Sequence, residues 1–219
     1  MILLSDPRIA AIPSTDDGDP LVDLRTVAGL RLDSRAADPA GAYARVRRAL
    51  ADRLLAAQAT LPDGLRLLVV EGYRPYAAQL GIFTGYRDEL RRLHPSWSDE
   101  RLHRETSKFV SPVEVAPHST GGAVDLTLCT SDGVELDMGT EIDATPEASG
   151  NACFTAADTI PDRARRNRQI MVDVLTGAGL VNYPTEWWHW SYGDRYWALV
   201  TGARSTRYGP LREVTPAAG

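Results

Sequence analysis

Hydrophobic and polar positions recur with two different periods along the chain, and together they predict both helices and strands. Apolar residues recur at helical spacing between 46 and 57, and an aspartate-proline pair before them supplies an N-cap, so a helix is predicted over 38–59. The run 65–70 is apolar and rich in branched residues, which predicts a buried strand. A second helix is expected over 75–94, where a broken apolar stripe stops at a histidine-proline pair.

The second half of the chain continues this mixture. A serine can cap a third helix that carries Leu102 and Phe109, and a long helix is predicted over 161–175, ended by glycines. Residues 131–159 are rich in loop signals, and residues 1–36 lack a sustained period and are expected to be coil or short strands. Further strands are predicted at 180–183, 186–190 and 196–201.

The strand that follows two glycines at 123–128 carries the first sign of chemistry. Its residues alternate, so Val124, Leu126 and Leu128 should face the core. Asp125 should then project from the opposite face. A carboxylate on a buried strand needs a cation, which can be either an arginine or a metal ion.

Composition narrows the class of protein. The chain has 219 residues, 43% of them hydrophobic and 24% charged, with a formal net charge of −5, which is ordinary for one soluble globular domain. We therefore expect a single domain over 1–219, with an irregular N-terminal segment at 1–36 and a C-terminal tail at 203–219. The basic run 163–168 is interpreted as a solvated helix face, so no nucleic-acid partner is expected.

The sequence also predicts a cytoplasmic protein without a membrane partner. The N-terminus has no basic region before its short apolar run, and no stretch approaches the roughly 18 apolar residues of a spanning helix. Cys129 and Cys153 do not form a disulfide framework, and both are expected to be reduced. The sequence does not indicate an oligomeric state.

Two of the four histidines lie in segments that could form a metal site. His118 precedes a glycine pair and Asp125, and His189 follows Glu186 and two tryptophans. In a regular strand Glu186 and His189 would face opposite sides, so they can converge only across a bend, which Pro184 makes plausible. The alternative is an apolar strand with incidental polar neighbours. Taken jointly, two imidazoles and two carboxylates are the residues of a hydrolytic zinc site with one spare base.

Arg74 is a third candidate, placed where the strand at 65–70 passes into a helix. In one interpretation it forms a structural ion pair. In the other it stabilises a developing oxyanion or binds a carboxylate.

These segments, in this order, resemble a known family. Residues 71–75 read Glu-Gly-Tyr-Arg-Pro, 118–128 contain His-Ser-x-Gly-x-Ala-x-Asp-Leu-Thr-Leu, 138–143 read Met-Gly-x-x-x-Asp, and 186–189 read Glu-Trp-Trp-His. The set is similar to the zinc-dependent D-alanyl-D-alanine dipeptidases linked to vancomycin resistance, over roughly 42–197. The resemblance implies a single α+β zinc peptidase domain with a mostly antiparallel central sheet flanked by helices and a zinc cleft on one face.

The resemblance also implies roles for individual residues. It makes His118, Asp125 and His189 the ligands of one Zn²⁺ per chain, Glu186 the catalytic base, and Arg74 the residue that stabilises the tetrahedral intermediate. Asp143 becomes the candidate for binding the free amino end of a small peptide substrate, and Tyr73 and Trp188 are further candidate substrate contacts.

The chain departs from the family pattern near the expected substrate site. Ala116-Pro117 stands where the family usually has a serine before its first zinc histidine, Thr120-Gly121 stands where many members place an arginine, and the family's tyrosine-bearing N-terminal segment is not found. The predicted function is therefore hydrolysis of D-alanyl-D-alanine or a similar small dipeptide. Two alternatives stay open: a D,D- or L,D-carboxypeptidase of the same fold that acts on peptidoglycan stem peptides, and a non-catalytic zinc-containing binding module.

Overall fold

The computed structural model describes residues 2–4, 6–107 and 110–211. Within these residues a central sheet of five strands has the order β2-β4-β5-β7-β6. The β2–β4 pair is parallel and the other three pairs are antiparallel. This confirms the predicted α+β fold with a mostly antiparallel central sheet. The strands are β2 (Arg31–Leu32), β4 (Leu65–Glu71), β5 (Ala123–Thr130), β6 (Val181–Asn182) and β7 (His189–Ser191).

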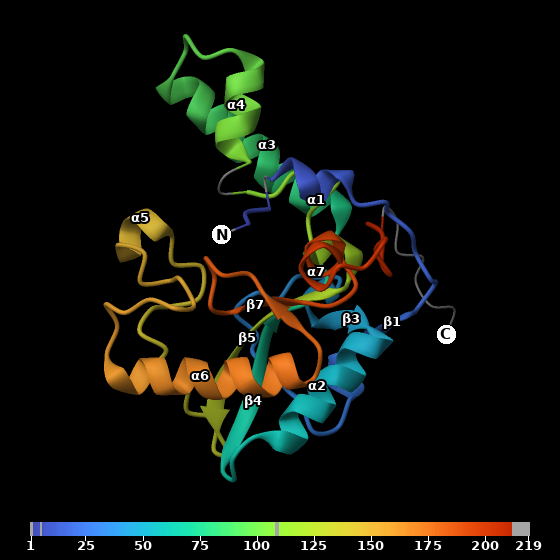
Figure 1. Cartoon of the computed structure of the whole chain (residues 1–219), viewed down its shortest axis with the longest axis vertical. Helices are drawn as coiled ribbons and strands as arrows, with labels where there is room; N and C mark the ends of the chain where they lie inside the picture. Colours follow the sequence, from blue (N-terminus) through green and yellow to red (C-terminus); the bar gives the residue numbers. More distant parts are fainter. Residues whose placement is uncertain (1, 5, 108–109, 212–219) are drawn as a thin grey trace.

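Helices surround this sheet, and two strands form a separate small ladder. Helices α2 and α6 pack together beside the sheet, whereas α3 and α4 form a hairpin that projects from the body (Figure 1). The helices are α1 (Pro7–Ala11), α2 (Arg48–Thr60), α3 (Tyr76–Leu93), α4 (Asp99–Thr106), α5 (Pro146–Ser149), α6 (Asp162–Gly177) and α7 (Arg195–Thr201), with short 3₁₀ turns η1 (Leu24–Thr26), η2 (Ala42–Ala44) and η3 (His118–Thr120). The small ladder pairs β1 (Leu21–Asp23) with β3 (Arg45–Arg47).

Strand β5 is the centre of the molecule, and its facing was predicted correctly. Val124, Leu126 and Leu128 are fully buried in the main hydrophobic core with residues from α2, α6 and β4. Asp125 projects from the other face, where it is also buried, at 4% exposure. The polar side of the strand is therefore a second interior surface rather than a solvated one.

The helix predicted over 38–59 begins later than expected. Residues 42–44 form η2, and 45–47 form β3, which pairs with β1, so α2 starts only at Arg48. Arg47 is 3% exposed, and its guanidinium donates to the Thr120 carbonyl and pairs with Asp16. These tertiary contacts outweigh the local helical pattern.

The strand predicted at 196–201 is wrong, because this segment is helix α7. A carboxylate oxygen of Asp194 accepts a hydrogen bond from the Trp197 backbone at 2.6 Å and caps the helix. Tyr196 and Ala198 are both buried. The aromatic and branched residues that suggested a strand are instead used for packing a short helix against α1.

Three smaller expectations need correction. Residues 1–36 contain the short strands β1 and β2, as expected, but also the helix α1, and the part of the tail at 203–211 buries Tyr208 completely. The run 163–168 is solvated at Arg163, but Arg168 is only 2% exposed. Phe109 lies outside the described residues. Cys129 and Cys153 are buried and free. Among the described residues, no helix combines the length and hydropathy needed to cross a bilayer.

Candidate active site

Strand register brings the polar residues of the site together. Asp125 on β5 lies opposite Glu71 on β4 and opposite His189 on β7. Directly opposed residues have Cβ atoms about 5 Å apart, so one row across the sheet presents a carboxylate, a second carboxylate and an imidazole. A register shift interrupts β4 between Val69 and Glu71, an irregularity that is frequent beside functional sites.

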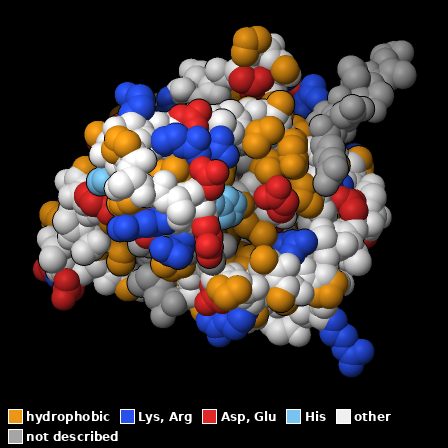
Figure 2. All heavy atoms as spheres, turned by 90° about the horizontal axis from the view of Figure 1, so that it is seen from above, with side chains coloured by type: hydrophobic (Ala, Val, Ile, Leu, Met, Phe, Trp, Pro, Cys, Tyr) orange, Lys and Arg blue, Asp and Glu red, His pale blue; other side chains and the backbone are white. Residues whose placement is uncertain are grey.

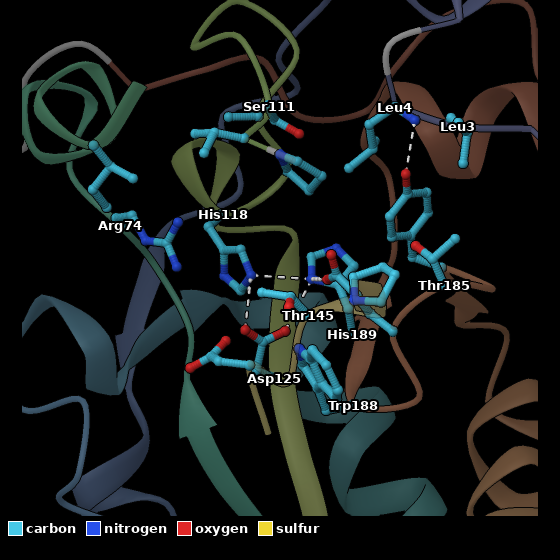
Figure 3. A pocket seen from close by; sticks show the side chains of 18 of the residues that line it. Leu3, Leu4, Arg74, Ser111, His118, Asp125, Thr145, Thr185, Trp188 and His189 are labelled. Carbon is cyan, nitrogen blue, oxygen red and sulfur yellow. Dashed lines mark hydrogen bonds and ion pairs between the residues drawn. The ribbon is translucent and has the colours of Figure 1, made fainter. Parts of the chain in front are cut away.

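His118 joins this row from the 3₁₀ turn η3, which directly precedes β5. Gly121 ends the turn with φ 70°, a left-handed conformation that favours glycine. The turn directs the His118 ring at the polar face of the sheet (Figure 3). Its Nδ1 lies 2.7 Å from the Gly72 carbonyl, which fixes this nitrogen as a donor and leaves Nε2 facing the other residues.

The three predicted metal ligands converge at a buried point. His118 Nε2 lies 3.1 Å from His189 Nδ1 and 3.3 Å from Asp125 Oδ2, and His189 Nδ1 lies 2.9 Å from Asp125 Oδ1. Each residue offers a ligand atom within 4.8 Å of the others, so the set could hold a metal ion. All three are at most 6% exposed.

The electrostatics of this set depend on the carboxylate. Burial alone would lower the pKa of His118, but the adjacent Asp125 overcomes it and raises the pKa to about 9. Burial would raise the pKa of Asp125, yet His118 and His189 hold it well below its usual range. Asp125 is therefore ionised and needs a cationic partner.

Glu186 reaches the site because its segment is a turn and not a strand. The expected strand over 186–190 begins only at His189, since the His189 backbone donates to the Glu186 carbonyl at 3.1 Å. Because of this turn, Glu186 and His189 point to the same side instead of to opposite faces of a strand. Glu186 Oε2 lies 4.0 Å from His189 Nδ1. Burial raises the pKa of Glu186, and the nearby Asp125 contributes in the same direction. A raised pKa suits a carboxylate that exchanges protons.

Arg74 lies across the site from His189. Its contacts agree both with a structural ion pair and with a role in binding an oxyanion or a carboxylate. Its guanidinium forms a bidentate pair with Glu71, at 2.8 and 2.6 Å, and donates to Gln79 Oε1 at 2.9 Å. These bonds use three of the five N–H groups of an arginine, so two are left for other acceptors. The Arg74 side chain lines the same cleft as His118, Asp125 and His189 and points towards His118 (Figure 3).

The cleft around these residues has a volume of about 360 Å³. On the face seen in Figure 2, basic, acidic and histidine side chains gather close to apolar ones. The cleft lining includes the predicted substrate residues Asp143 and Trp188. Asp143 is exposed and adopts φ 63°, which is uncommon for a residue other than glycine. Although the residue is exposed as a whole, partial desolvation of its carboxyl group in the cleft raises its pKa, and Asp125 and Glu71 contribute in the same direction.

Tyr73 is the predicted site residue that the structure does not bring to the cleft. It is 3% exposed, is not among the lining residues, and its hydroxyl donates to the Leu211 carbonyl at 3.3 Å. A substrate contact by Tyr73 has no geometric support. The tyrosine instead ties the strand end to the C-terminal part of the chain.

The sequence analysis missed two features of the cleft. Leu3 and Leu4 line it, and the Leu4 backbone donates to the Tyr183 hydroxyl at 3.1 Å. The short apolar run at the N-terminus was the available signal. Gln79 is 2% exposed and links Arg74 to the Ser111 carbonyl. A glutamine on the buried side of a helix was the corresponding signal there.

The fold and the site define an α+β domain with a cleft whose buried histidines and aspartate could hold a metal ion, and the comparisons specify the family. The family model described as D-ala-D-ala dipeptidase, peptidase M15, matches residues 31–202. The chain belongs to this D-ala-D-ala dipeptidase family.

Individual relatives agree with this membership. The chain is 32% identical over 216 residues to a D-alanyl-D-alanine dipeptidase of Synechocystis sp., covering 86% of this chain and 87% of that one. It is 31% identical over 150 residues to one of Enterococcus faecium, covering 66% and 71%. A solved LdcB LD-carboxypeptidase matches with a TM-score of 0.47 and 20% identity, covering 88% of this chain and 77% of that one. That structural likeness is too weak to add to the functional argument.

Proposed function

We propose that the protein is a zinc-dependent dipeptidase that hydrolyses D-alanyl-D-alanine or a similar small dipeptide with a free amino end. The observation that carries the proposal is the buried convergence of His118, Asp125 and His189 beside Glu186. The names of the curated relatives support the choice of D-alanyl-D-alanine as substrate.

The donor set fits one zinc ion per chain. Two imidazole nitrogens and one carboxylate are typical of catalytic zinc sites, which keep a further position open. The Gly72 carbonyl bonds the remote nitrogen of His118 and thereby orients the ring as ligating histidines are usually oriented. A bound zinc would supply a Lewis acid and a water molecule whose pKa is lowered to about 7.

Glu186 is the proposed base. It would accept a proton from the attacking water and donate it to the leaving amine. Its raised pKa brings its proton affinity closer to that of the groups with which it exchanges protons. Trp187 and Trp188 follow it in the sequence and are buried, and Trp188 lines the cleft, so its surroundings are partly apolar, which strengthens local electrostatic interactions.

Arg74 and Asp143 are the proposed substrate-binding charges. The N–H groups of Arg74 that are not engaged by Glu71 or Gln79 would donate to the scissile carbonyl oxygen as negative charge develops there. The Asp143 carboxylate would bind the substrate ammonium. Trp188 would contact the body of the dipeptide with its ring. A short peptide with a free amino end could place its scissile carbonyl at Arg74 and its ammonium at Asp143 at the same time.

The proposal is tested by measuring both the zinc content and the peptidase activity of the protein and its variants. The protein should contain one zinc per chain and cleave D-alanyl-D-alanine, and His118→Ala should lose both the zinc and the activity. Undiminished zinc in His118→Ala would exclude that ligand. Zinc binding without hydrolysis of any dipeptide or stem peptide would favour the non-catalytic module.

A carboxypeptidase that trims peptidoglycan stem peptides is the second candidate. Ala116 lines the cleft in place of the family's usual serine, so one contact for the substrate ammonium is missing. The same screen should include a stem pentapeptide. Faster cleavage of the pentapeptide than of the dipeptide would select the carboxypeptidase. A cytoplasmic location is part of the dipeptidase proposal, and the free state of Cys129 and Cys153 is compatible with it.

A further inference from the structure

Arg168 on α6 is a buried cation that the proposed chemistry does not use. It is 2% exposed, and no ion pair joins it to a carboxylate within the described part of the chain. Burial lowers its pKa to about 10, which still leaves the guanidinium charged near neutral pH. A buried charge without a carboxylate in direct contact is costly to stability, so this position calls for a role beyond packing.

The guanidinium binds three backbone carbonyls of a single loop. Its Nε donates to Met138 at 2.7 Å, Nη1 to Phe154 at 2.6 Å and Nη2 to Ala152 at 2.9 Å. Met138 precedes Asp143 in the sequence, and Ala152 and Phe154 follow it. Arg168 therefore holds together the two ends of the loop that carries the proposed ammonium-binding carboxylate.

This loop has little regular structure of its own. Between the end of β5 and the start of α6, the described residues of this loop contain only the one-turn helix α5 and an isolated β-bridge at Glu135. Backbone carbonyls of such a loop depend on other groups for hydrogen bonds. Arg168 supplies three such hydrogen bonds, on both sides of Asp143.

The same side chain also reaches the segment that carries Glu186. The Arg168 Cζ lies 5.5 Å from the centroid of the Trp187 ring. The Trp187 ring donates to Thr140 Oγ1 at 2.8 Å, and its backbone donates to the Cys153 carbonyl at 3.1 Å. Trp187 directly follows Glu186, so the loop of Asp143 and the turn of Glu186 are joined through Arg168 and Trp187.

We propose that Arg168 is a positioning residue that fixes Asp143 relative to Glu186 and so determines how strongly the enzyme selects a free amino end. This inference rests on the proposed function. It predicts that changing Arg168 alters the recognition of the substrate ammonium, while the metal ligands on β5, β7 and η3 keep their arrangement.

The test compares a free dipeptide with its N-acetylated derivative in the zinc-loaded enzyme. We expect Arg168→Met to reduce the ratio of the two kcat/KM values by about 10- to 100-fold, because small displacements of substrate-binding groups have effects of this size. Zinc content should stay at the wild-type level. Arg168→Lys keeps the charge but cannot span three carbonyls, so its ratio should lie between those of wild type and Arg168→Met.

Arg165→Met is the matched control. Arg165 lies on the same helix and also donates to loop carbonyls, those of Asp158 and Ile160. It is exposed, however, and these two carbonyls come later in the sequence than the ones that Arg168 binds. Its ratio should equal that of the wild type. A role of Arg168 in stability alone would lower the melting temperature and leave the ratio unchanged.

The outcomes separate this inference from the proposed function. A wild-type ratio in zinc-loaded Arg168→Met overturns the positioning role. If that variant does not fold, a wild-type ratio in Arg168→Lys overturns it equally. If the wild-type enzyme cleaves free and acetylated dipeptides equally, Asp143 does not bind the substrate ammonium, and the positioning role of Arg168 is refuted as well. A failure of zinc binding or of hydrolysis would instead refute the proposed function directly.

Discussion

The proposed metal site and the proposed substrate-contacting part of the cleft are built differently. His118, Asp125 and His189 project from paired strands and a 3₁₀ turn and are at most 6% exposed. Asp143 is exposed, lies in a loop and has φ 63°. Strand pairing places Asp125 and His189 of the first group, whereas Arg168 donates to backbone carbonyls on both sides of Asp143.

Because of this difference, the residues proposed for catalysis and those proposed for substrate recognition can change independently. Strand register can change only in steps that move every neighbouring residue, so the metal-ligand geometry tolerates little drift. A loop can shift without disturbing the sheet, so substrate recognition can change while the chemistry is retained. Of the departures of this chain from the family pattern, the N-terminal segment falls in the second group, whereas Ala116-Pro117 and Thr120-Gly121 lie in or beside the turn that carries His118.

The largest effect is expected for Glu186→Gln. The amide has nearly the same shape but cannot take up a proton, so turnover should fall by about 100- to 10,000-fold. Zinc content, measured by elemental analysis, should be unchanged because Glu186 is not a proposed ligand. Loss of zinc would place Glu186 among the ligands, and near-normal turnover would remove it from the mechanism.

The next effect is expected for Arg74→Ala. Removal of one donor to a developing oxyanion typically costs about 100- to 1,000-fold in kcat. Because Arg74 is also paired with Glu71, the double variant Glu71→Gln/Arg74→Ala separates catalysis from the ion pair. If the loss in the single variant comes only from an unpaired Glu71, the double variant should recover activity. Arg66→Ala, on β4 with Glu71 but outside the cleft lining, should behave as wild type.

An intermediate effect is expected from pH at the substrate side. The pKa of Asp143 is raised above 3.8, so its carboxylate becomes protonated at a higher pH than an ordinary aspartate. As the pH falls through this raised value, the ammonium contact is lost and KM for the free dipeptide should increase. The acetylated dipeptide, which has no ammonium, should not share this increase. In Asp143→Asn the increase should be absent and KM should be high at every pH; a persistent increase would assign the titration to another group.

The sequence predicted the buried part of the site well for a physical reason. The alternation of Val124, Asp125 and Leu126 already assigns the carboxylate to one face, and a buried carboxylate requires a partner. The pairing of that strand with β4 and β7, which aligns Asp125 with Glu71 and His189, is a long-range property. The sequence analysis grouped Asp125 with His118, His189 and Glu186 as a candidate metal site but did not predict this pairing.

The errors in secondary structure have a common cause. Helix α7 was predicted as a strand because its aromatic and branched residues favour strands, but the cap from Asp194 begins a helix that packs against α1. The strand β3 was predicted as helix because Val46 fits a helical period by coincidence. Arg168 was assigned to solvent together with neighbours that are exposed, since its carbonyl partners lie in a distant loop. Tertiary contacts are decisive at each of these positions.

The smallest effect is expected for Tyr183→Phe, which tests whether the N-terminal segment belongs to the loop-like part of the site. The variant removes the acceptor of the Leu4 N–H and should lower stability by about 1 kcal/mol, measured by denaturant unfolding. The zinc content should not change, but KM should, because Leu3 and Leu4 line the cleft. Tyr196→Phe is the control, since Tyr196 packs edge-on against Tyr183 at 5.3 Å in the same aromatic cluster and is not the partner of Leu4. An unchanged KM in Tyr183→Phe, with the expected loss of stability, would restrict this segment to a structural role and leave substrate recognition to the loop of Asp143.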